Sequence, residues 1–395
     1  MKFLRLIAFL FVFQSASSQS FIPETIESNK LKENRTFTVY LPKNYEANVV
    51  NKYPVMLVLD GEYLAQPING ILNYSNYWDD LPEIIIVAVN QNYAEKRYID
   101  SEFDENGLPS GSGAKFFEFI GLELLPYVEK KYRTLPFRII AGHDTTASFL
   151  NAYLYKDNPV FDAYISLGAE FPTAMETRVA DRLKSIKKNI FYYHASADGD
   201  ITELKEKAIA LDENIKNSIP QNLKYRFNFF ENASHYSLVA KAIPEALYFI
   251  FDRYQPISMV EFQEKISKLE SGYTNYLIEK YTYLNQNLGL EVKPRLTDFK
   301  AIEAAILKNN AFAELQELSK YAEKHYPKTT LSVYHQALYF EKTGEFKKAI
   351  KEYQKGYSKE AIRELSKDFM LSRAEALKGK PDQPKEETNT EIKEE

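Results

Sequence analysis

Short apolar runs alternate with longer amphipathic segments over the first 255 residues of the chain. The runs at 55–59, 84–89 and 163–167 have the length of strands and carry no charge. Such runs are typical of parallel strands that are buried on both faces of a sheet. The other predicted elements are strands at 36–41, 139–140, 190–193 and 225–230 and helices at 116–132, 147–155, 204–218 and 237–254. This alternation predicts an α/β fold with a doubly wound, mostly parallel sheet. The first strand is expected at an edge of the sheet, because Pro42 ends it.

The pattern changes at Gln255 and Pro256, and from 257 to 378 it is helical throughout. Small and aromatic residues recur here at the core positions of a tetratricopeptide repeat: Val333, Ala337, Phe340, Gly344, Phe346, Ala349, Tyr353 and Gly356. Segment 301–325 is a weaker copy of the same helical hairpin. We therefore expect an α/β domain over 22–255 and a small all-α helical-repeat domain over 257–378. The tail, 379–395, is charged and poor in apolar residues, which predicts disorder.

The amino terminus has the pattern of a secretory signal peptide over residues 1–18. Lys2 and Arg5 supply positive charge, residues 6–13 are apolar, and Ala16 begins a small-residue cleavage site. The apolar run is too short to span a bilayer, and no later segment of the sequence has the pattern of a transmembrane helix. An uncleaved anchor is the alternative interpretation. We expect a periplasmic or extracellular protein, and export without any cysteine favours a bacterial envelope.

The composition of the chain argues against several classes of function and excludes some kinds of site. The chain is 45% hydrophobic and 27% charged, so a sizeable core is expected. The net charge of −5 argues against general nucleic-acid binding. The absence of cysteine excludes disulfides, thiolate metal sites and a cysteine nucleophile. The sequence predicts neither a metal ion nor another cofactor.

The segment 138–147 reads Arg-Ile-Ile-Ala-Gly-His-Asp-Thr-Thr-Ala and has the outline of a nucleophile elbow. In such an elbow a small-x-nucleophile-x-small pattern forms a sharp turn between a buried strand and a helix. The residue at the tip of this turn is Asp144, where an ester hydrolase has serine. This position decides which hydrolytic chemistry the chain can perform.

A hydrolase of this type also needs a histidine base and an acid that orients it, in the chain order nucleophile, acid, histidine. His235 is the candidate base, because it lies in a polar loop between the last predicted strand and the last helix. Asp198 and Asp200 follow the strand at 190–193, and we prefer Asp198 as the acid. The alternative is that these aspartates only form a turn around the glycine between them.

An oxyanion hole in this fold uses two backbone N–H groups. Thr145, which follows the tip, would supply one of them. The loop after the strand at 55–59 would supply the other, from Gly61 or Glu62. The glycine would permit a close approach of the backbone.

Jointly these motifs resemble the putative-esterase family of α/β-hydrolases, which includes esterase D-like and ferric-siderophore esterases. The resemblance covers about residues 24–254, and the matching segments are 35–45, 53–61, Arg97, 110–116, 124–133, 141–143 and the loop around His235. It implies an α/β-hydrolase fold and activity on acyl esters, thioesters or siderophore lactones. Some exported members of the family also carry a tetratricopeptide-like extension, which the carboxyl-terminal part of this chain resembles.

The chain departs from the family pattern at the elbow, which is Gly-His-Ser-x-Gly-Gly in the family. Serine is replaced by Asp144, and the two glycines by Thr146 and Ala147. Threonine is bulkier and β-branched, so an altered turn is expected. If Asp144 and His235 lie side by side, the histidine is expected to titrate above its usual value near 6.5.

These features support three hypotheses. The first is an exported pseudoenzyme, or very weak esterase, that binds an ester-like small molecule or a partner. The second is an active hydrolase in which Asp144 is the nucleophile, or in which Asp144 and His235 activate a water. An aspartyl nucleophile suits attack on a saturated carbon, whereas attack on a carboxylic ester would give an anhydride. The third is a protein-interaction module formed by the helical repeats on a hydrolase scaffold.

Overall fold

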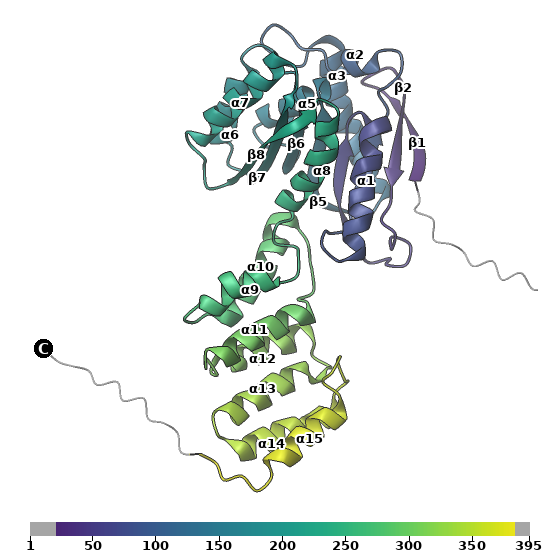
Figure 1. The fold of residues 1–395 in the computed structure, drawn as a ribbon. Helices are drawn as coiled ribbons and strands as arrows, with labels where there is room; N and C mark the ends of the chain where they lie inside the picture. Colours follow the sequence, from purple (N-terminus) through teal and green to yellow (C-terminus); the bar gives the residue numbers. More distant parts are fainter. Residues whose placement is uncertain (1–20, 384–395) are drawn as a thin grey trace, which may run out of the picture. The chain divides into compact units, whose positions relative to one another are not determined.

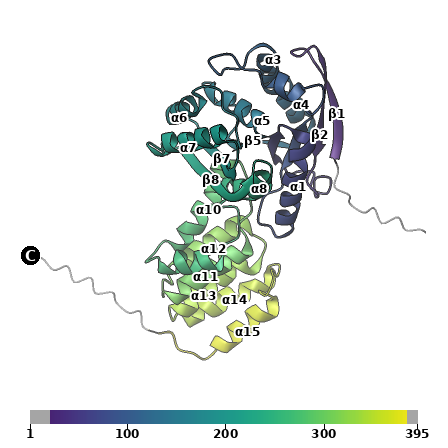
Figure 2. The same cartoon turned by 45° about the horizontal axis from the view of Figure 1, so that its top comes forward.

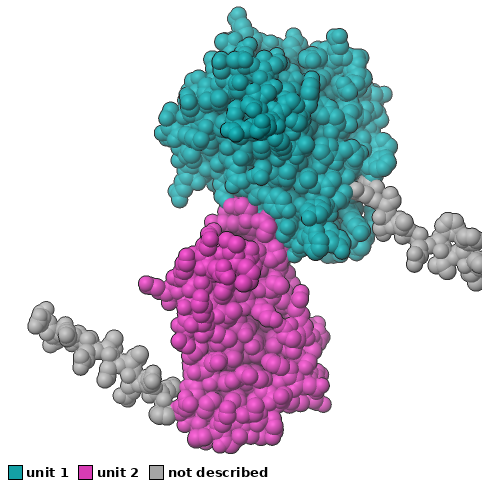
Figure 3. Space-filling model, in the orientation of Figure 1, with its two compact units in different colours: residues 1–251 teal, residues 252–395 magenta. Residues whose placement is uncertain are grey.

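A computed structural model describes residues 21–383, which form two compact units that divide between Phe251 and Asp252 (Figure 3). The predicted signal peptide and most of the predicted carboxyl-terminal tail lie outside the described residues. The last described residues, 379–383, belong to neither a helix nor a strand. Among residues 21–383, none of the helices combines the length and the hydrophobicity that a transmembrane span requires.

The first unit is built on one eight-stranded sheet with the strand order β1-β2-β4-β3-β5-β6-β7-β8. The strands are β1 (Phe21–Ser28), β2 (Glu33–Tyr40), β3 (Tyr53–Val58), β4 (Ile85–Val89), β5 (Thr134–His143), β6 (Ala163–Leu167), β7 (Ile190–Gly199) and β8 (Leu223–Ser234). All pairs from β4 to β8 are parallel, and only β1–β2 and β2–β4 are antiparallel. The sequence prediction of a doubly wound, mostly parallel sheet is confirmed.

The expectation that the strand at 36–41 lies at an edge of the sheet is wrong. This strand is β2, and it pairs with β4 on one side and with β1 on the other. The edge strand on this side of the sheet is β1, where Pro23 lies opposite Thr38. A proline is tolerated in an edge strand because one side of that strand needs no backbone donor.

Helices cover both faces of the sheet (Figure 1). They are α1 (Gly61–Tyr77), α2 (Lys96–Asp100), α3 (Gly111–Phe119), a π-helical segment (Ile120–Leu124), α4 (Leu125–Lys131), α5 (Thr145–Phe149) with a 3-10 continuation (Leu150–Tyr155), α6 (Met175–Ser185), α7 (Thr202–Lys216) and α8 (Ser237–Ile250). On one face, Leu57 and Val87 of the sheet share a core with Phe116 of α3 and Val179 of α6. Helices α1 and α8 lie side by side on the other face. In this fold, ligands bind beyond the carboxyl ends of the parallel strands.

The second unit contains only helices in its described part, and most of them are stacked one after another (Figure 2). They are α9 (Met259–Glu264), a 3-10 turn (Ile266–Lys268), α10 (Tyr273–Leu288), α11 (Leu296–Lys308), α12 (Glu314–His325), α13 (Thr330–Lys342), α14 (Phe346–Lys355), a 3-10 turn (Gly356–Ser358) and α15 (Lys367–Leu377). Gly344 joins α13 to α14 with a φ of +77°, a conformation that glycine adopts without strain. Val333 and Tyr353 pack in one core with Met370 of α15.

Candidate active site

The turn between β5 and α5 has the geometry of a nucleophile elbow. β5 ends at His143, Asp144 has φ 60° and ψ −121°, and α5 begins at Thr145. A non-glycine residue rarely adopts such a conformation, which stores strain and is concentrated at functional sites. A side chain at Gly142 would come within 2.8 Å of the backbone of Thr146, so glycine is required there. The sharp turn is therefore retained with aspartate at its tip.

Thr146 stabilises the turn, contrary to the expectation from the sequence that a threonine here alters it. Its buried hydroxyl donates to Asp60 Oδ2 over 2.6 Å and accepts from the backbone N–H of His143 over 3.0 Å. Asp60 directly precedes α1, so this hydroxyl joins the start of α1 to the elbow. Threonine is larger than the glycine of the family pattern, but the hydrogen bonds of its hydroxyl keep the turn closed.

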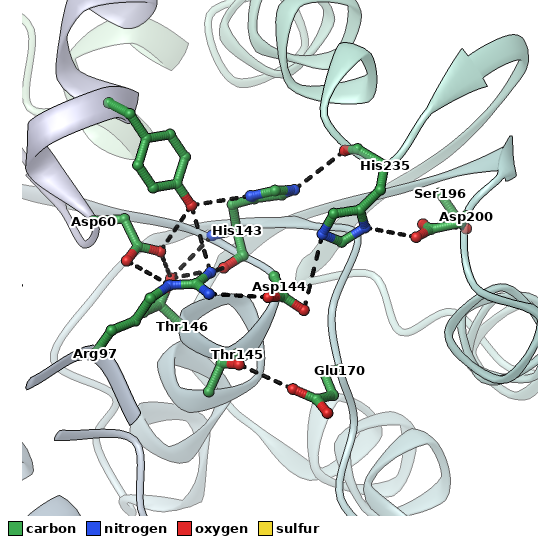
Figure 4. A network of polar contacts seen from close by, with 11 residues as sticks. Asp60, Arg97, His143, Asp144, Thr145, Thr146, Glu170, Ser196, Asp200 and His235 are labelled. Carbon is green, nitrogen blue, oxygen red and sulfur yellow. Dashed lines mark hydrogen bonds and ion pairs between the residues drawn. The ribbon is translucent and has the colours of Figure 1, made fainter. Parts of the chain in front are cut away.

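Arg97 of α2 also joins Asp60 to the elbow, through hydrogen bonds of its guanidinium (Figure 4). Its guanidinium donates to Asp60 Oδ1 over 2.7 Å, to Asp144 Oδ2 over 3.0 Å and to the carbonyl oxygen of His143 over 2.8 Å. The Asp60 side chain is 1% exposed and that of Arg97 is 17% exposed. Burial raises the pKa of Asp60, and the hydrogen bonds from Arg97 and Thr146 oppose that shift. The carboxylate at the elbow tip is thus already paired with a cation.

His235 lies between two carboxylates. Its Nδ1 is 2.6 Å from Asp200 Oδ1, and its Nε2 is 3.9 Å from Asp144 Oδ1. Asp200 is buried at the end of β7 and also accepts a hydrogen bond from Ser196. The hydrogen bond to Asp200 raises the pKa of His235 against the effect of burial, and the charge of Asp144 adds to this shift. The pair can therefore hold a proton beside the elbow tip.

The preference for Asp198 as the partner of His235 is wrong. The Asp198 carboxylate accepts from the backbone N–H groups of Asn232 and Ala233 over 2.9 and 3.1 Å. These hydrogen bonds lower the pKa of Asp198. Asp198 thus holds the backbone of the loop that carries His235, while Asp200 contacts the imidazole itself.

His143, next to the tip, is buried and neutral. Burial, together with the charge of His235, lowers its pKa to about 4. Its Nδ1 is 3.0 Å from the Tyr63 hydroxyl, and its Nε2 is 3.2 Å from the backbone carbonyl oxygen of His235. Its ring also packs on that of His235, with 4.4 Å between the ring centroids. His143 therefore orients the histidine loop.

The residues proposed for the oxyanion hole begin two helices. Gly61 and Glu62 open α1, and Thr145 opens α5, so their N–H groups have no partner within the helix. A side chain at Gly61 would meet the backbone of Ala88 at 2.7 Å, so glycine is required for packing. The hydroxyl of Thr145 donates to Glu170 over 2.9 Å. The oxyanion role of these N–H groups remains a prediction.

An open cavity of about 490 Å³ lies over the tip. Tyr63, Tyr93, Tyr98 and Tyr236 line it together with Arg97 and Asp144. All four tyrosine side chains are at least 40% exposed. The cavity therefore offers aromatic surface beside the paired carboxylate of Asp144, and Glu95 adds a second carboxylate to its lining.

Comparisons with known proteins agree with this geometry. Residues 28–155 match the Esterase family, described as putative esterase. An uncharacterised protein from Capnocytophaga ochracea is 29% identical in a superposition that covers 91% of this chain and 99% of the other, with a TM-score of 0.84. No curated protein matches the chain.

The α/β unit has an α/β-hydrolase fold, and its residues 28–155 are similar to putative esterases. An IroE-like serine hydrolase from Shewanella oneidensis shares the fold, with 20% identity, coverage of 77% of this chain and 99% of the other, and a TM-score of 0.57. The BES protein from Bacillus cereus shares it over 63% of this chain and 98% of its own, with 18% identity and a TM-score of 0.51.

Several residues of this hydrolase-like site are not predicted to be functional from the sequence. Arg97 appears there only as one of the matching positions, while Asp60, Tyr63 and Glu170 carry no role. Arg97 was the detectable one, because an arginine that matches a family pattern is a stronger sign of function than a matching apolar core residue. Nothing in the sequence indicates that Asp60 binds it.

Proposed function

We propose that the hydrolase-like domain binds a ligand over the elbow and does not turn over carboxylic esters at an appreciable rate. The position of the Asp144 carboxylate supports this proposal most directly. It is ion-paired with Arg97 and lies 3.9 Å from His235 Nε2, where an ester hydrolase has a hydroxyl for the base to deprotonate. A carboxylate has no proton to give, and its attack on an ester would form a reactive anhydride.

The loss of the nucleophile leaves the binding surface in place. The cavity over the tip is within the size range of small-molecule sites and is lined by exposed tyrosine rings. The ligand class that fits is a small ester-like molecule whose carbonyl group lies near the first N–H groups of α1 and α5. The signal-like sequence over residues 1–18 supports action outside the cytoplasm.

An active hydrolase is the second candidate. The observation that favours it is the retained pair of His235 and Asp200, at 2.6 Å, beside a tip that keeps its strained backbone. In this alternative Asp144 attacks a saturated carbon, or Asp144 and His235 together activate a water molecule. The ion pair with Arg97 opposes the first route, because it withdraws charge from the attacking oxygen.

Hydrolysis assays with matched variants separate the two candidates. Wild-type protein is tested beside Asp144→Asn, which keeps the shape of the tip, and beside His235→Ala, on activated short-chain esters and on epoxide and haloalkane substrates. The proposal predicts rates at the level of buffer for all three proteins. A wild-type rate that disappears in both variants would establish the active hydrolase instead.

A further inference from the structure

The helical unit contains a separate cavity of about 220 Å³. It is bounded by α11, α13, the segment 362–365 and α15, and most of its wall is apolar: Leu296, Phe299, Leu331, Ile362, Leu365 and Phe369. A cavity of about 150 Å³ in a protein core is large enough for benzene. This cavity therefore has room for one substituted ring, and it is too small for most drug-sized ligands.

One buried polar side chain in this wall has an unused hydrogen-bonding atom. His335 is 1% exposed, its Nε2 lies 3.1 Å from Glu303 Oε2, and its Nδ1 has no partner among residues 21–383. The ring is stacked against Phe299, with 6.1 Å between the centroids and 20° between the planes. A buried nitrogen without a partner lowers stability. A ligand that supplies the missing hydrogen bond would remove this cost.

Glu303 fixes the orientation of the His335 ring. Glu303 accepts hydrogen bonds both from His335 and from the Tyr334 hydroxyl, which lies 2.9 Å away. Because Nε2 is engaged with this carboxylate, Nδ1 is the atom left for a ligand. A hydroxyl group suits it, since a hydroxyl can donate to a neutral imidazole and accept from a charged one.

An exposed cation lies at the same cavity. Arg363 is exposed, has a φ of 47°, and forms no hydrogen bond or ion pair within the described part of the chain. Lys300 is ion-paired with Glu364 at 2.5 Å, and the Glu303 carboxylate on the same wall is engaged by Tyr334 and His335. The guanidinium therefore favours an anionic group over a cationic one.

We propose that this cavity binds a small, single-ring ligand that carries a hydroxyl group against His335 and an anionic group against Arg363. The site lies wholly in the helical unit, so it does not depend on the function proposed for the hydrolase-like domain. It gives that unit a small-molecule binding role.

Three commercial probes with the same ring test each part of the proposal. 4-Hydroxyphenylacetate has both groups, phenylacetate lacks the hydroxyl, and tyramine replaces the carboxylate with an ammonium. Binding to the purified full chain is measured by calorimetry and by ligand-observed NMR. We expect 4-hydroxyphenylacetate to bind with a Kd of about 1 mM or below, and the other two probes to bind about tenfold more weakly or worse.

Two variants assign the contacts. His335→Phe keeps the stacking and removes the ring nitrogens, so the preference for 4-hydroxyphenylacetate over phenylacetate should disappear. Arg363→Gln lies on the exposed segment and should weaken both carboxylates by about tenfold without weakening tyramine. Lys308→Gln, on the exposed end of α11 outside the cavity, is the control.

The proposal is overturned if the wild-type protein binds none of the probes at millimolar concentration. It is also overturned if Arg363→Gln lowers affinity no more than Lys308→Gln does. Circular dichroism checks that His335→Phe is folded. If that variant fails to fold, the comparison of 4-hydroxyphenylacetate with phenylacetate on the wild-type protein still decides the role of the hydroxyl.

Discussion

Arg97 is the residue whose loss should disturb the hydrolase-like site most. It is the one cation that hydrogen-bonds both Asp60 and Asp144 within the described part of the chain. Removal of one partner of a buried ion pair costs about 3–5 kcal/mol, because the other charge remains buried. Asp60 is almost fully buried, but Arg97 is 17% exposed, and Thr146 still donates to Asp60. We therefore expect Arg97→Gln to lower the free energy of unfolding by about 3 kcal/mol, at the lower end of that range.

Urea unfolding followed by the fluorescence of Trp78 measures this loss, because the single tryptophan of the chain lies in the hydrolase-like domain. Arg97→Gln, Asp60→Asn and the double variant form a cycle with an expected coupling energy of about 1–3 kcal/mol. Lys30→Gln is the control, since the Lys30–Glu118 pair is 38% and 50% exposed and solvent screening leaves it little effect on stability. An equal loss in Arg97→Gln and Lys30→Gln would refute the reasoning.

Two further predictions concern the titration of the site and the packing of α1. Because the pKa of His235 is raised in the folded state, protonation of this side chain stabilises the fold. The stabilisation is complete below a pH of about 6.5 and is lost as the pH rises through the folded-state pKa. Asp200→Asn should lower that pKa in an NMR titration and weaken the pH dependence of unfolding; an unchanged pKa would contradict the contact. Gly61→Ala should cost about 2 kcal/mol in thermal unfolding, because the new methyl group meets the backbone of Ala88. Gly70→Ala in the same helix has open space and should stabilise the domain by up to about 1 kcal/mol; equal effects would disprove the packing argument.

The sequence predicts the central strands well, because strands buried on both faces must be apolar over their whole length. No helix is predicted over α1, whose segment contains Pro67 and Gly70. The helix forms because Leu64, Ile68 and Leu72 recur at helical spacing and are buried. Tertiary packing here overrides local propensity.

The location of the site could be predicted from the direction of the parallel strands. The parallel strands β5 and β7 end at one edge of the sheet, so the elbow and the acid after β7 must lie near each other. The choice between Asp198 and Asp200 could not be made, because both flank one glycine and only the backbone of the strand determines which carboxylate faces His235. Arg97 could not be placed either, since 47 residues separate it from Asp144.

The most direct test of the account is ester hydrolysis by the wild-type protein beside Asp144→Ser. The serine would have His235 and Asp200 in place to activate it. The account predicts no wild-type rate above buffer and a measurable, His235-dependent rate in Asp144→Ser on activated short-chain esters. A wild-type rate that Asp144→Ser abolishes would show that Asp144 takes part in catalysis and would contradict the account.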